Sequence, residues 1–340
     1  MNARKVRIAT VSLNPAIDQT AIVLNFTAGA VNRVQREQSD AGGKGVNVAS
    51  FLAQTGHDVV VTGLLGREND GPFARLFAEK NIADRFVRLP GATRVNIKVV
   101  DDAQDRVTDI NFPGLRPGAL EMEALADAID ELAGDVEWFV LSGSVPAGIP
   151  NDVYATLSTR LKRRGRTVVL DASGAPFAAA IAAGPAAAPD IIKPNIDELQ
   201  ELLGRRLDDD PEVVTAARSL IGNGIRTVAV SMGTRGAIFV EAGTALLASP
   251  PKIAVKSTVG AGDAMVAGLI AGKLQALSLE RCARLATAFS LGALGEIGHS
   301  LPSPAILESY AKNVTIHQLE YERSAPAERG APARTNDGRR

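Results

Sequence analysis

The chain has 340 residues, of which 46% are hydrophobic, and its formal net charge at pH 7 is −1. This length suits one large α/β domain or two smaller ones, and the near-zero charge gives no field that would favour nucleic acid or an anionic membrane. The one cysteine, Cys282, excludes an intramolecular disulfide framework and indicates a reduced, cytoplasmic setting. The apolar run after the basic N-terminus makes a poor signal peptide, and no segment has the roughly 20 uncharged apolar residues of a membrane span.

Short β-branched segments alternate with helical patterns along most of the chain. Strands are predicted over residues 7–13, 59–65, 137–142, 167–171, 191–193, 227–231 and 237–241. Helices are predicted over residues 46–54, 73–80, 120–132, 151–164, 197–203 and 212–222, with two amphipathic helices between 264 and 294. This alternation is typical of a mostly parallel sheet with helices on both faces. The predicted fold class is therefore α/β, and ligands of such folds bind outside the carboxyl ends of the strands.

Two regions depart from the alternation. Residues 20–39 show no clear helical period, and residues 93–111 read as two consecutive strands with a turn around 102–105. We expect segments of about 14–40 and 92–112 to form a small β-sheet that projects from the main body as a lid; an ordinary edge hairpin is the alternative. Lids exclude water from phosphoryl-transfer sites and complete those sites when they close.

A single domain that carries this lid is expected over residues 1–323. The remaining residues, 324–340, contain mostly Ala, Pro, Gly and charged side chains and almost no large apolar ones. Such a composition cannot bury enough apolar surface to fold, so a disordered tail is predicted there.

A glycine-rich segment, Ala41-Gly42-Gly43-Lys44-Gly45-Val46-Asn47, leads into the first predicted helix. Glycines let a ligand approach the backbone closely, Lys44 is a point charge suited to phosphate, and Asn47 could bond sugar hydroxyls from the first helical turn. The Walker A spacing is absent, and a plain turn is the alternative. Upstream, Asp18 follows the first strand, where it could accept hydrogen bonds from two sugar hydroxyls or be only a turn aspartate.

Residues Arg94, Asn96 and Lys98 recur at period two, which places them on one face of one predicted strand. Two cations and an amide on the same side could read phosphate and hydroxyl groups; the alternative is a solvated strand face. Where a later strand passes into a helix, Asn195 and Glu198 are three residues apart and share a face. This pair suits Mg²⁺, often through water. It also fits a helix capping box, and both interpretations can hold together.

Two further glycine segments lie in the C-terminal half. Ser231-Met232-Gly233-Thr234-Arg235-Gly236 is a strand followed by a glycine turn that suits nucleotide phosphates. Ser257-Thr258-Val259-Gly260-Ala261-Gly262-Asp263 opens an apolar helical run, so its backbone N–H groups and the helix dipole form a site for negative charge. Asp263 could take a proton from a substrate hydroxyl, or serve only as the helix N-cap. An anion site and a base within seven residues suggest phosphoryl transfer to an alcohol.

Taken together and in order, these segments resemble the ribokinase-like (PfkB) carbohydrate kinases over about residues 6–312. The glycine motifs at 42–49 and 257–263 carry the resemblance. It implies a three-layer α/β domain with a mostly parallel central sheet and a small β-sheet lid. It also implies that Asp263 is the general base and that Gly260, Ala261 and Gly262 form the anion hole for the transferring phosphoryl group.

The resemblance further implies which residues bind ligands. The sugar phosphate would be held by Asp18, Gly42, Gly43, Lys44, Asn47, Arg94, Asn96, Lys98 and Ser144. The nucleotide would be held by Lys193, Ser231, Gly233, Thr234, Gly236 and Ser257. Mg²⁺ would be held by Asn195 and Glu198, directly or through water.

Within the family, the chain is most similar to the branch that acts on phosphosugars. This similarity implies an ATP- and Mg²⁺-dependent kinase that phosphorylates C6 of D-fructose 1-phosphate to give fructose 1,6-bisphosphate. Kinases for tagatose 6-phosphate or fructose 6-phosphate are alternatives, and a catalytically silent phosphosugar sensor is a remoter one. A nucleotide-cofactor oxidoreductase would need a Gly-x-Gly-x-x-Gly motif after the first strand, which is absent. Dimers of this family clasp through the lid, so a homodimer is expected in which Arg33 reaches the neighbouring subunit's site.

Overall fold

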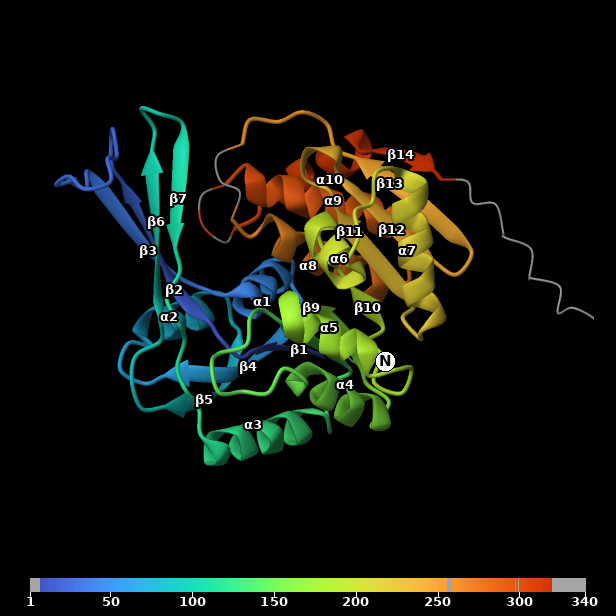
Figure 1. Cartoon of the computed structure of the whole chain (residues 1–340), viewed down its shortest axis with the longest axis horizontal. Helices are drawn as coiled ribbons and strands as arrows, with labels where there is room; N and C mark the ends of the chain where they lie inside the picture. The colour runs from blue at the N-terminus through green and yellow to red at the C-terminus, as the bar shows by residue number, and fades with distance from the viewer. Residues whose placement is uncertain (1–6, 256–258, 297, 299, 320–340) are drawn as a thin grey trace, which may run out of the picture.

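The computed structural model describes residues 7–255, 259–296, 298 and 300–319 (Figure 1). The predicted tail over 324–340 and the nucleotide candidate Ser257 therefore lie outside the described residues. No helix among the described residues has the length and apolarity that a membrane crossing requires.

Ten strands of the described residues form one large sheet in the order β14-β13-β12-β11-β10-β9-β8-β1-β4-β5. Neighbouring strands from β11 to β5 pair in parallel, while β12, β13 and β14 add an antiparallel edge. The prediction of a mostly parallel sheet is thus confirmed. The strands are β1 (Arg7–Ser12), β4 (Asp58–Gly66), β5 (Ala83–Leu89), β8 (Trp138–Ser142), β9 (Thr167–Asp171), β10 (Ile191–Ile192), β11 (Thr227–Ser231), β12 (Ala237–Glu241), β13 (Thr244–Ser249) and β14 (Thr315–Gln318).

Helices cover both faces of this sheet, because its central strands are apolar on both sides. Val59 and Val61 pack in one core, whereas Val60 between them packs in a second core on the opposite face. The first core includes α1 (Lys44–Gln54), α2 (Gly71–Glu79), α8 (Ala261–Leu274), α9 (Leu279–Leu294) and α10 (Pro304–Asn313). The second includes α3 (Ala119–Leu132), α4 (Val153–Arg163), α5 (Gly174–Ala182), α6 (Ile196–Leu203) and α7 (Asp210–Gly222). The three-layer α/β prediction is confirmed.

Helix α8 differs from the amphipathic helix predicted there. Every residue from Asp263 to Gly272 is buried, because α8 packs against both α1 and α9. A Cβ atom on Gly268 would lie 2.8 Å from the Cα of Ala286 in α9, so the glycine lets the two helices approach closely. Of the two predicted helices, only α9 is amphipathic. Burial of α8 fixes its first turn, and with it Asp263, deep in the main body.

A second sheet of four strands stands apart from the large one, at the left of Figure 1. Its order is β3-β2-β6-β7. Strand β2 pairs antiparallel with β3 and parallel with β6, and β6 pairs antiparallel with β7. This is the small sheet expected for the lid, and the edge-hairpin alternative is wrong because the two sheets share no strand. The strands are β2 (Ala16–Ile22), β3 (Arg36–Gly42), β6 (Val95–Asp101) and β7 (Arg106–Ile110).

Candidate active site

The helices α1 and α8 begin next to each other, and a glycine sets each starting point. Gly43, which precedes α1, has a φ of 102°, and a Cβ on it would lie 2.8 Å from the Cα of Pro15. Gly260, which precedes α8, has a φ of 77°. Only glycine adopts such angles without strain. The first turns of both helices therefore meet, and they bring Asn47 and Asp263 together.

Asp263 lies in the first turn of α8 with only 6% of its surface exposed. The Nδ2 atom of Asn47 donates a hydrogen bond to Oδ2 of Asp263 at 2.7 Å. Burial and the nearby negative charge of Asp171 raise the pKa of Asp263 to about 6, although Lys44, Asn47 and Lys193 act in the opposite direction. A carboxyl group with this pKa is ionised at neutral pH and close to the optimum for proton transfer.

Asp171, which no sequence motif marks, is the central charge of the site. It ends β9, is 1% exposed, and its Oδ1 lies 3.1 Å from Nζ of Lys44 and 3.4 Å from Nζ of Lys193. Burial alone would raise the pKa of Asp171, but the two ammonium groups lower it. Burial likewise acts to lower the pKa of Lys44, and the carboxylates around it raise it instead. The signal that could have identified Asp171 is its place at the carboxyl end of a buried strand.

Lys193 also lies against the first turn of α8. A Cβ atom on Gly262 would be 3.4 Å from Nζ of Lys193, so the ammonium group faces the segment that the sequence predicts as an anion hole. Gly260, Ala261 and Gly262 present the first backbone N–H groups and the positive dipole end of α8 there. An ammonium group beside a helix N-terminus attracts a phosphoryl group more strongly than either feature alone.

Asn195 and Glu198 form the capping box that the sequence allows. Oδ1 of Asn195 accepts from the backbone N–H of Glu198 at 2.8 Å, and the N–H of Asn195 donates to Oε2 of Glu198 at 2.8 Å. The charge of Glu198 also helps to raise the pKa of Lys44. Its carboxylate therefore acts on the same charged cluster as Asp171.

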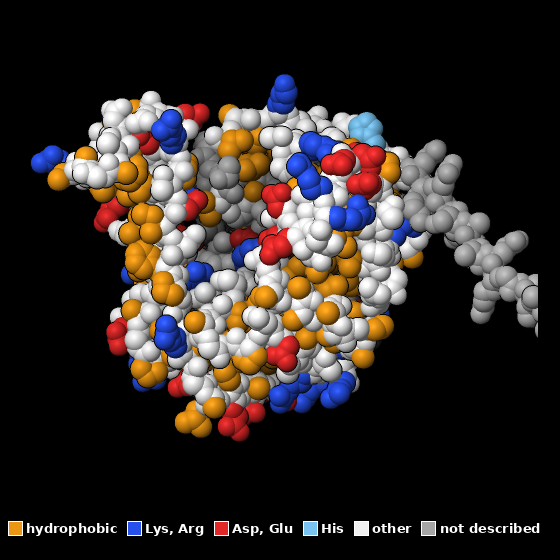
Figure 2. Space-filling view, in the orientation of Figure 1, with side chains coloured by type: hydrophobic (Ala, Val, Ile, Leu, Met, Phe, Trp, Pro, Cys, Tyr) orange, Lys and Arg blue, Asp and Glu red, His pale blue; other side chains and the backbone are white. Residues whose placement is uncertain are grey.

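Candidate residues on the lid line a cavity of about 600 Å³, which includes Val259 and Gly298 of the main body. Figure 2 shows the hollow between the lid, at the left, and the body. Asp18, Asn96 and Lys98 are among its lining residues. Asn96 donates to Oδ1 of Asp18 at 3.1 Å, and Lys98 forms an ion pair with Asp109 of the neighbouring strand.

The position predicted for Asp18 needs correction. The sequence suggests that it lies at the carboxyl end of β1, but it is the third residue of β2. The reason is that only Leu13, Asn14 and Pro15 separate β1 from β2, so the chain enters the lid soon after β1 ends. Asp18 can therefore reach a ligand only from the lid side of the cavity.

Arg94 lies just before β6, and its guanidinium is occupied by backbone oxygens. It donates to the carbonyls of Asn14 at 2.8 Å, Pro15 at 3.3 Å and Phe112 at 3.2 Å. Ser144, exposed after β8, accepts from Nδ2 of Asn14 at 3.1 Å. Gly42 is the last residue of β3, next to Gly43. These residues gather where the chain crosses between the body and the lid.

The nucleotide candidates lie at the turn between β11 and β12. Ser231 ends β11 and bridges to Asn195, which places the turn beside the start of α6. Gly233 and Thr234 are exposed in a short 3₁₀ turn. A Cβ atom on Gly236 would lie 2.0 Å from the carbonyl oxygen of Ala248, so the turn requires a glycine there. Lys193 precedes Pro194, whose carbonyl accepts from the N–H of Ser231 at 3.0 Å, and the ammonium group of Lys193 lies with Asp171.

Comparison with known proteins agrees with the fold. The profile of the family described as "pfkB family carbohydrate kinase" matches residues 11–306. The 1-phosphofructokinase of Rhodobacter capsulatus is 54% identical over 315 residues, which are 92% of this chain and 98% of that protein. The 1-phosphofructokinase of Escherichia coli K12 is 39% identical over 290 residues, which are 85% of this chain and 91% of that protein.

Solved structures include two of phosphofructokinase-2 from Escherichia coli. The complex with substrates and products has a TM-score of 0.83 at 28% identity, over 90% of this chain and 99% of that one. The complex with fructose-6-phosphate has a TM-score of 0.82 at 27% identity, over 90% and 98%. The family profile spans most of the chain and confirms the resemblance seen in the sequence. The chain belongs to the pfkB family of carbohydrate kinases.

Proposed function

We propose that this chain transfers the γ-phosphoryl group of ATP to the C6 hydroxyl of D-fructose 1-phosphate, which gives fructose 1,6-bisphosphate. The curated relatives described above bear the name 1-phosphofructokinase. The observation that carries the proposal is the buried Asp263, with a pKa of about 6, in the first turn of a helix whose N-terminus faces Lys193. A base and an anion site in one turn are what phosphoryl transfer to an alcohol needs.

Asp263 is the general base in this proposal. Its carboxylate takes the proton of the C6 hydroxyl as that oxygen attacks the phosphoryl group. The hydrogen bond from Asn47 orients the carboxylate and leaves its other oxygen for the substrate. The N–H groups of Gly260, Ala261 and Gly262 and the ammonium of Lys193 stabilise the negative charge of the transferring group.

The sugar phosphate would bind between the lid and the body. Asp18 and Asn96 offer a carboxylate and an amide to its hydroxyls, and Lys98 lines the same cavity. Gly43 and Gly42 let the ligand approach the backbone at the start of α1. Lys44 supplies a charge for the phosphate, and Arg94 and Ser144 border the crossing where the sugar would enter.

The residues present also fit ATP and Mg²⁺. Oδ2 of Asp171 is buried without a hydrogen-bond partner among the described residues, as expected of a group that faces a bound ligand or ordered water. Mg²⁺ would be held by Asn195 and Glu198, directly or through water, and would neutralise charge on the triphosphate. Ser231, Gly233, Thr234 and Gly236 would hold the nucleotide at the adjoining turn.

A coupled ADP-release assay with Mg-ATP tests the proposal. We expect kcat/KM to be highest for fructose 1-phosphate when fructose 6-phosphate and tagatose 6-phosphate are compared. Fructose 6-phosphate is the second candidate, because the phosphofructokinase-2 structure of similar fold is a complex with that sugar. A preference for either 6-phosphate would reverse the sugar's orientation, and no turnover on any of the three would favour a silent sensor.

Removal of the Lys44 ammonium should weaken sugar-phosphate binding selectively. In Lys44→Ala we expect KM for the phosphosugar to rise about 10- to 150-fold, the cost of a lost charge-assisted hydrogen bond. KM for ATP should change much less. Lys312→Ala is the control, since this exposed lysine on α10 pairs only with Glu308 among the described residues. Equal increases of both KM values in steady-state kinetics would contradict the phosphate-binding role.

We also propose a homodimer that forms through the lid. One relative is described as a tetrameric inhibited form of phosphofructokinase-2, so assembly occurs among proteins of this fold. Between β2 and β3, Val31 and Val34 are 83% and 54% exposed, and such apolar groups favour a contact. Arg33, exposed between them, would then reach the partner subunit's site.

A further inference from the structure

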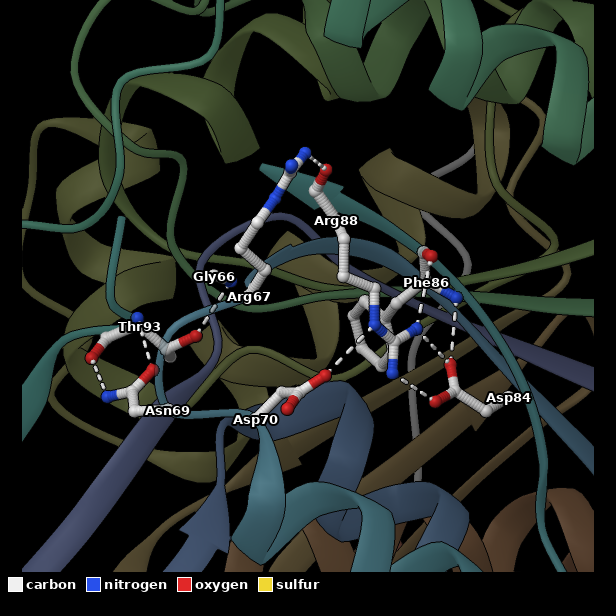
Figure 3. A network of polar contacts seen from close by, with 8 residues as sticks. All are labelled: Gly66, Arg67, Asn69, Asp70, Asp84, Phe86, Arg88 and Thr93. Atoms are coloured by element: carbon white, nitrogen blue, oxygen red, sulfur yellow. Dashed lines mark hydrogen bonds and ion pairs between the residues drawn. The ribbon is translucent and has the colours of Figure 1, made fainter. Parts of the chain in front are cut away.

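The segment that connects β5 to the lid is held along its length by the end of β4 and the turn that follows it. Figure 3 shows Thr93 of this segment beside Gly66 and Asn69. The N–H of Arg67 donates to the carbonyl of Leu89 at 3.0 Å, and the N–H of Glu68 donates to that of Gly91 at 3.2 Å. A Cβ atom on Gly66 would lie 2.4 Å from the backbone N of Thr93. The connection therefore lies directly on the backbone of this turn.

The side-chain amide of Asn69 pairs with both backbone polar groups of Thr93, as Figure 3 shows. Its Oδ1 accepts from the N–H of Thr93 at 2.7 Å, and its Nδ2 donates to the carbonyl of Thr93 at 2.8 Å. The Oγ1 of Thr93, which is 2% exposed, accepts from the N–H of Gly66 at 2.9 Å. We call these three hydrogen bonds the Asn69 clamp. They give the N–H, the carbonyl and the hydroxyl oxygen of Thr93 one partner each, and the two backbone groups are paired as a neighbouring strand would pair them.

The body side of the Asn69 clamp is anchored in the first core through α2. Asn69 and Asp70 lead directly into α2, whose Phe73 and Phe77 are buried in the first core. Asp70 accepts from Nε of Arg88 at 3.3 Å, which ties the start of α2 to β5. Movement of Asn69 would disturb this packing. The Asn69 clamp therefore holds Thr93 at a fixed position relative to the first core.

The lid side of the Asn69 clamp continues at once into Arg94. The guanidinium of Arg94 binds the carbonyls of Asn14 and Phe112, which lie on two other crossings between body and lid. Its own carbonyl accepts from the N–H of Ile17 in β2 at 2.9 Å. Strand β6 follows with Asn96 and Lys98, both of which line the cavity. The position of Thr93 thus sets the base of the whole lid.

We propose that Asn69 is a positioning residue for the sugar-phosphate side of the site. It touches none of the residues that would carry out the transfer, and it acts through Thr93 on Arg94 and β6. The inference rests on the proposed function for its kinetic consequence. Its structural consequence, a fixed lid base, does not depend on which sugar is phosphorylated.

Asn69→Ala should separate the two substrates kinetically. We expect KM for fructose 1-phosphate to rise about 10- to 100-fold, because small displacements of a binding group cost this much, while KM for ATP stays within about twofold. Amide hydrogen exchange should increase in residues 94–112 and stay unchanged in α8 and α9. Asn69→Asp keeps the acceptor for Thr93 and loses the donor, so its KM for the sugar phosphate should lie between those of wild type and Asn69→Ala.

Ser158→Ala is the matched control, because it removes a buried side-chain hydrogen bond, to the carbonyl of Ala187 at 2.6 Å, on α4 of the body. It should lower the melting temperature and leave both KM values unchanged. Folded Asn69 variants with equal changes in both KM values, or with unchanged exchange in residues 94–112, would overturn the positioning role. If wild type phosphorylates none of the sugars, the proposed function fails, and hydrogen exchange still decides whether the clamp fixes the lid.

Discussion

Asp263→Asn should lower kcat for the phosphosugar by about 10²–10⁴-fold, the contribution typical of a general base. The asparagine keeps the size of the side chain and can still accept from Asn47 through its Oδ1. It cannot take a proton from the C6 hydroxyl. Because the proposal assigns binding of the sugar mostly to Lys44 and the lid, KM should change far less than kcat. Steady-state kinetics with Mg-ATP measures both parameters.

The pH dependence of wild type provides a second readout of Asp263. If Asp263 is the base, as proposed, activity requires its carboxylate, and kcat/KM should fall as the pH decreases through about 6. Folding raises the pKa of Asp263 from 3.8 to about 6, so the folded chain holds this proton more tightly than the unfolded chain does. Ionisation therefore costs stability above pH 6, and the free energy of unfolding of Asp263→Asn should exceed that of wild type there.

Asp127→Asn serves as the control, because it removes an exposed carboxylate on α3, which packs in the second core, whereas α8 with Asp263 packs in the first. Its kcat and its pH profile should match those of wild type. A folded Asp263→Asn protein that retains near-normal kcat would show that another group removes the proton, and the assignment of the base would be wrong.

Strands buried on both faces are the elements that sequence predicts best. The ranges 167–171, 227–231 and 237–241 coincide with β9, β11 and β12, because continuous apolar runs have few other interpretations. Strands β5, β13 and β14 of the large sheet are missing from the prediction. Strand β5 carries Asp84 and Arg88 on the edge of the sheet, where charged side chains remain partly accessible. The order of charged and apolar residues in β5 therefore does not distinguish this strand from a loop.

Local motifs predict the parts of the site, but they do not predict its charge pairs. Asn47 and Asp263 are 216 residues apart in the chain, and Lys44 and Asp171 are 127 apart. Asn47, Lys44 and Asp263 can each be selected from the glycines near them in the sequence, whereas Asp171 has no such motif. The partner of each is set by how the strands are ordered, which no short segment encodes. This is why Asp171 is invisible to motif analysis.

Asp171→Asn should strongly destabilise the folded protein. It removes the carboxylate that pairs with the ammonium groups of Lys44 and Lys193, and Lys193 is only 4% exposed. Removal of one partner from a buried ion pair costs about 3–5 kcal/mol, since the other charge stays buried without compensation. Equilibrium unfolding in urea at pH 7.5, about 1.5 units above the pKa of Asp263, measures this loss.

The same variant should move the pH profile in a defined direction. Asp171 raises the pKa of Asp263, whereas Lys44 and Lys193 lower it. Without Asp171, the two ammonium groups act alone on Asp263, so its pKa decreases and the acid limb of kcat/KM shifts below pH 6. This shift tests whether the two carboxylates interact within one site.

Asp190→Asn is the matched control, because Asp190 is 2% exposed and pairs with Lys162 at 2.7 Å and with Arg226 at 3.2 Å, away from Asp263. Its free energy of unfolding should also fall, since a mostly buried ammonium again loses its partner. The acid limb of the kcat/KM profile of Asp190→Asn should stay at about pH 6, the pKa of Asp263. If both variants lose stability and neither moves the limb, Asp171 contributes to folding alone and does not set the protonation of the base.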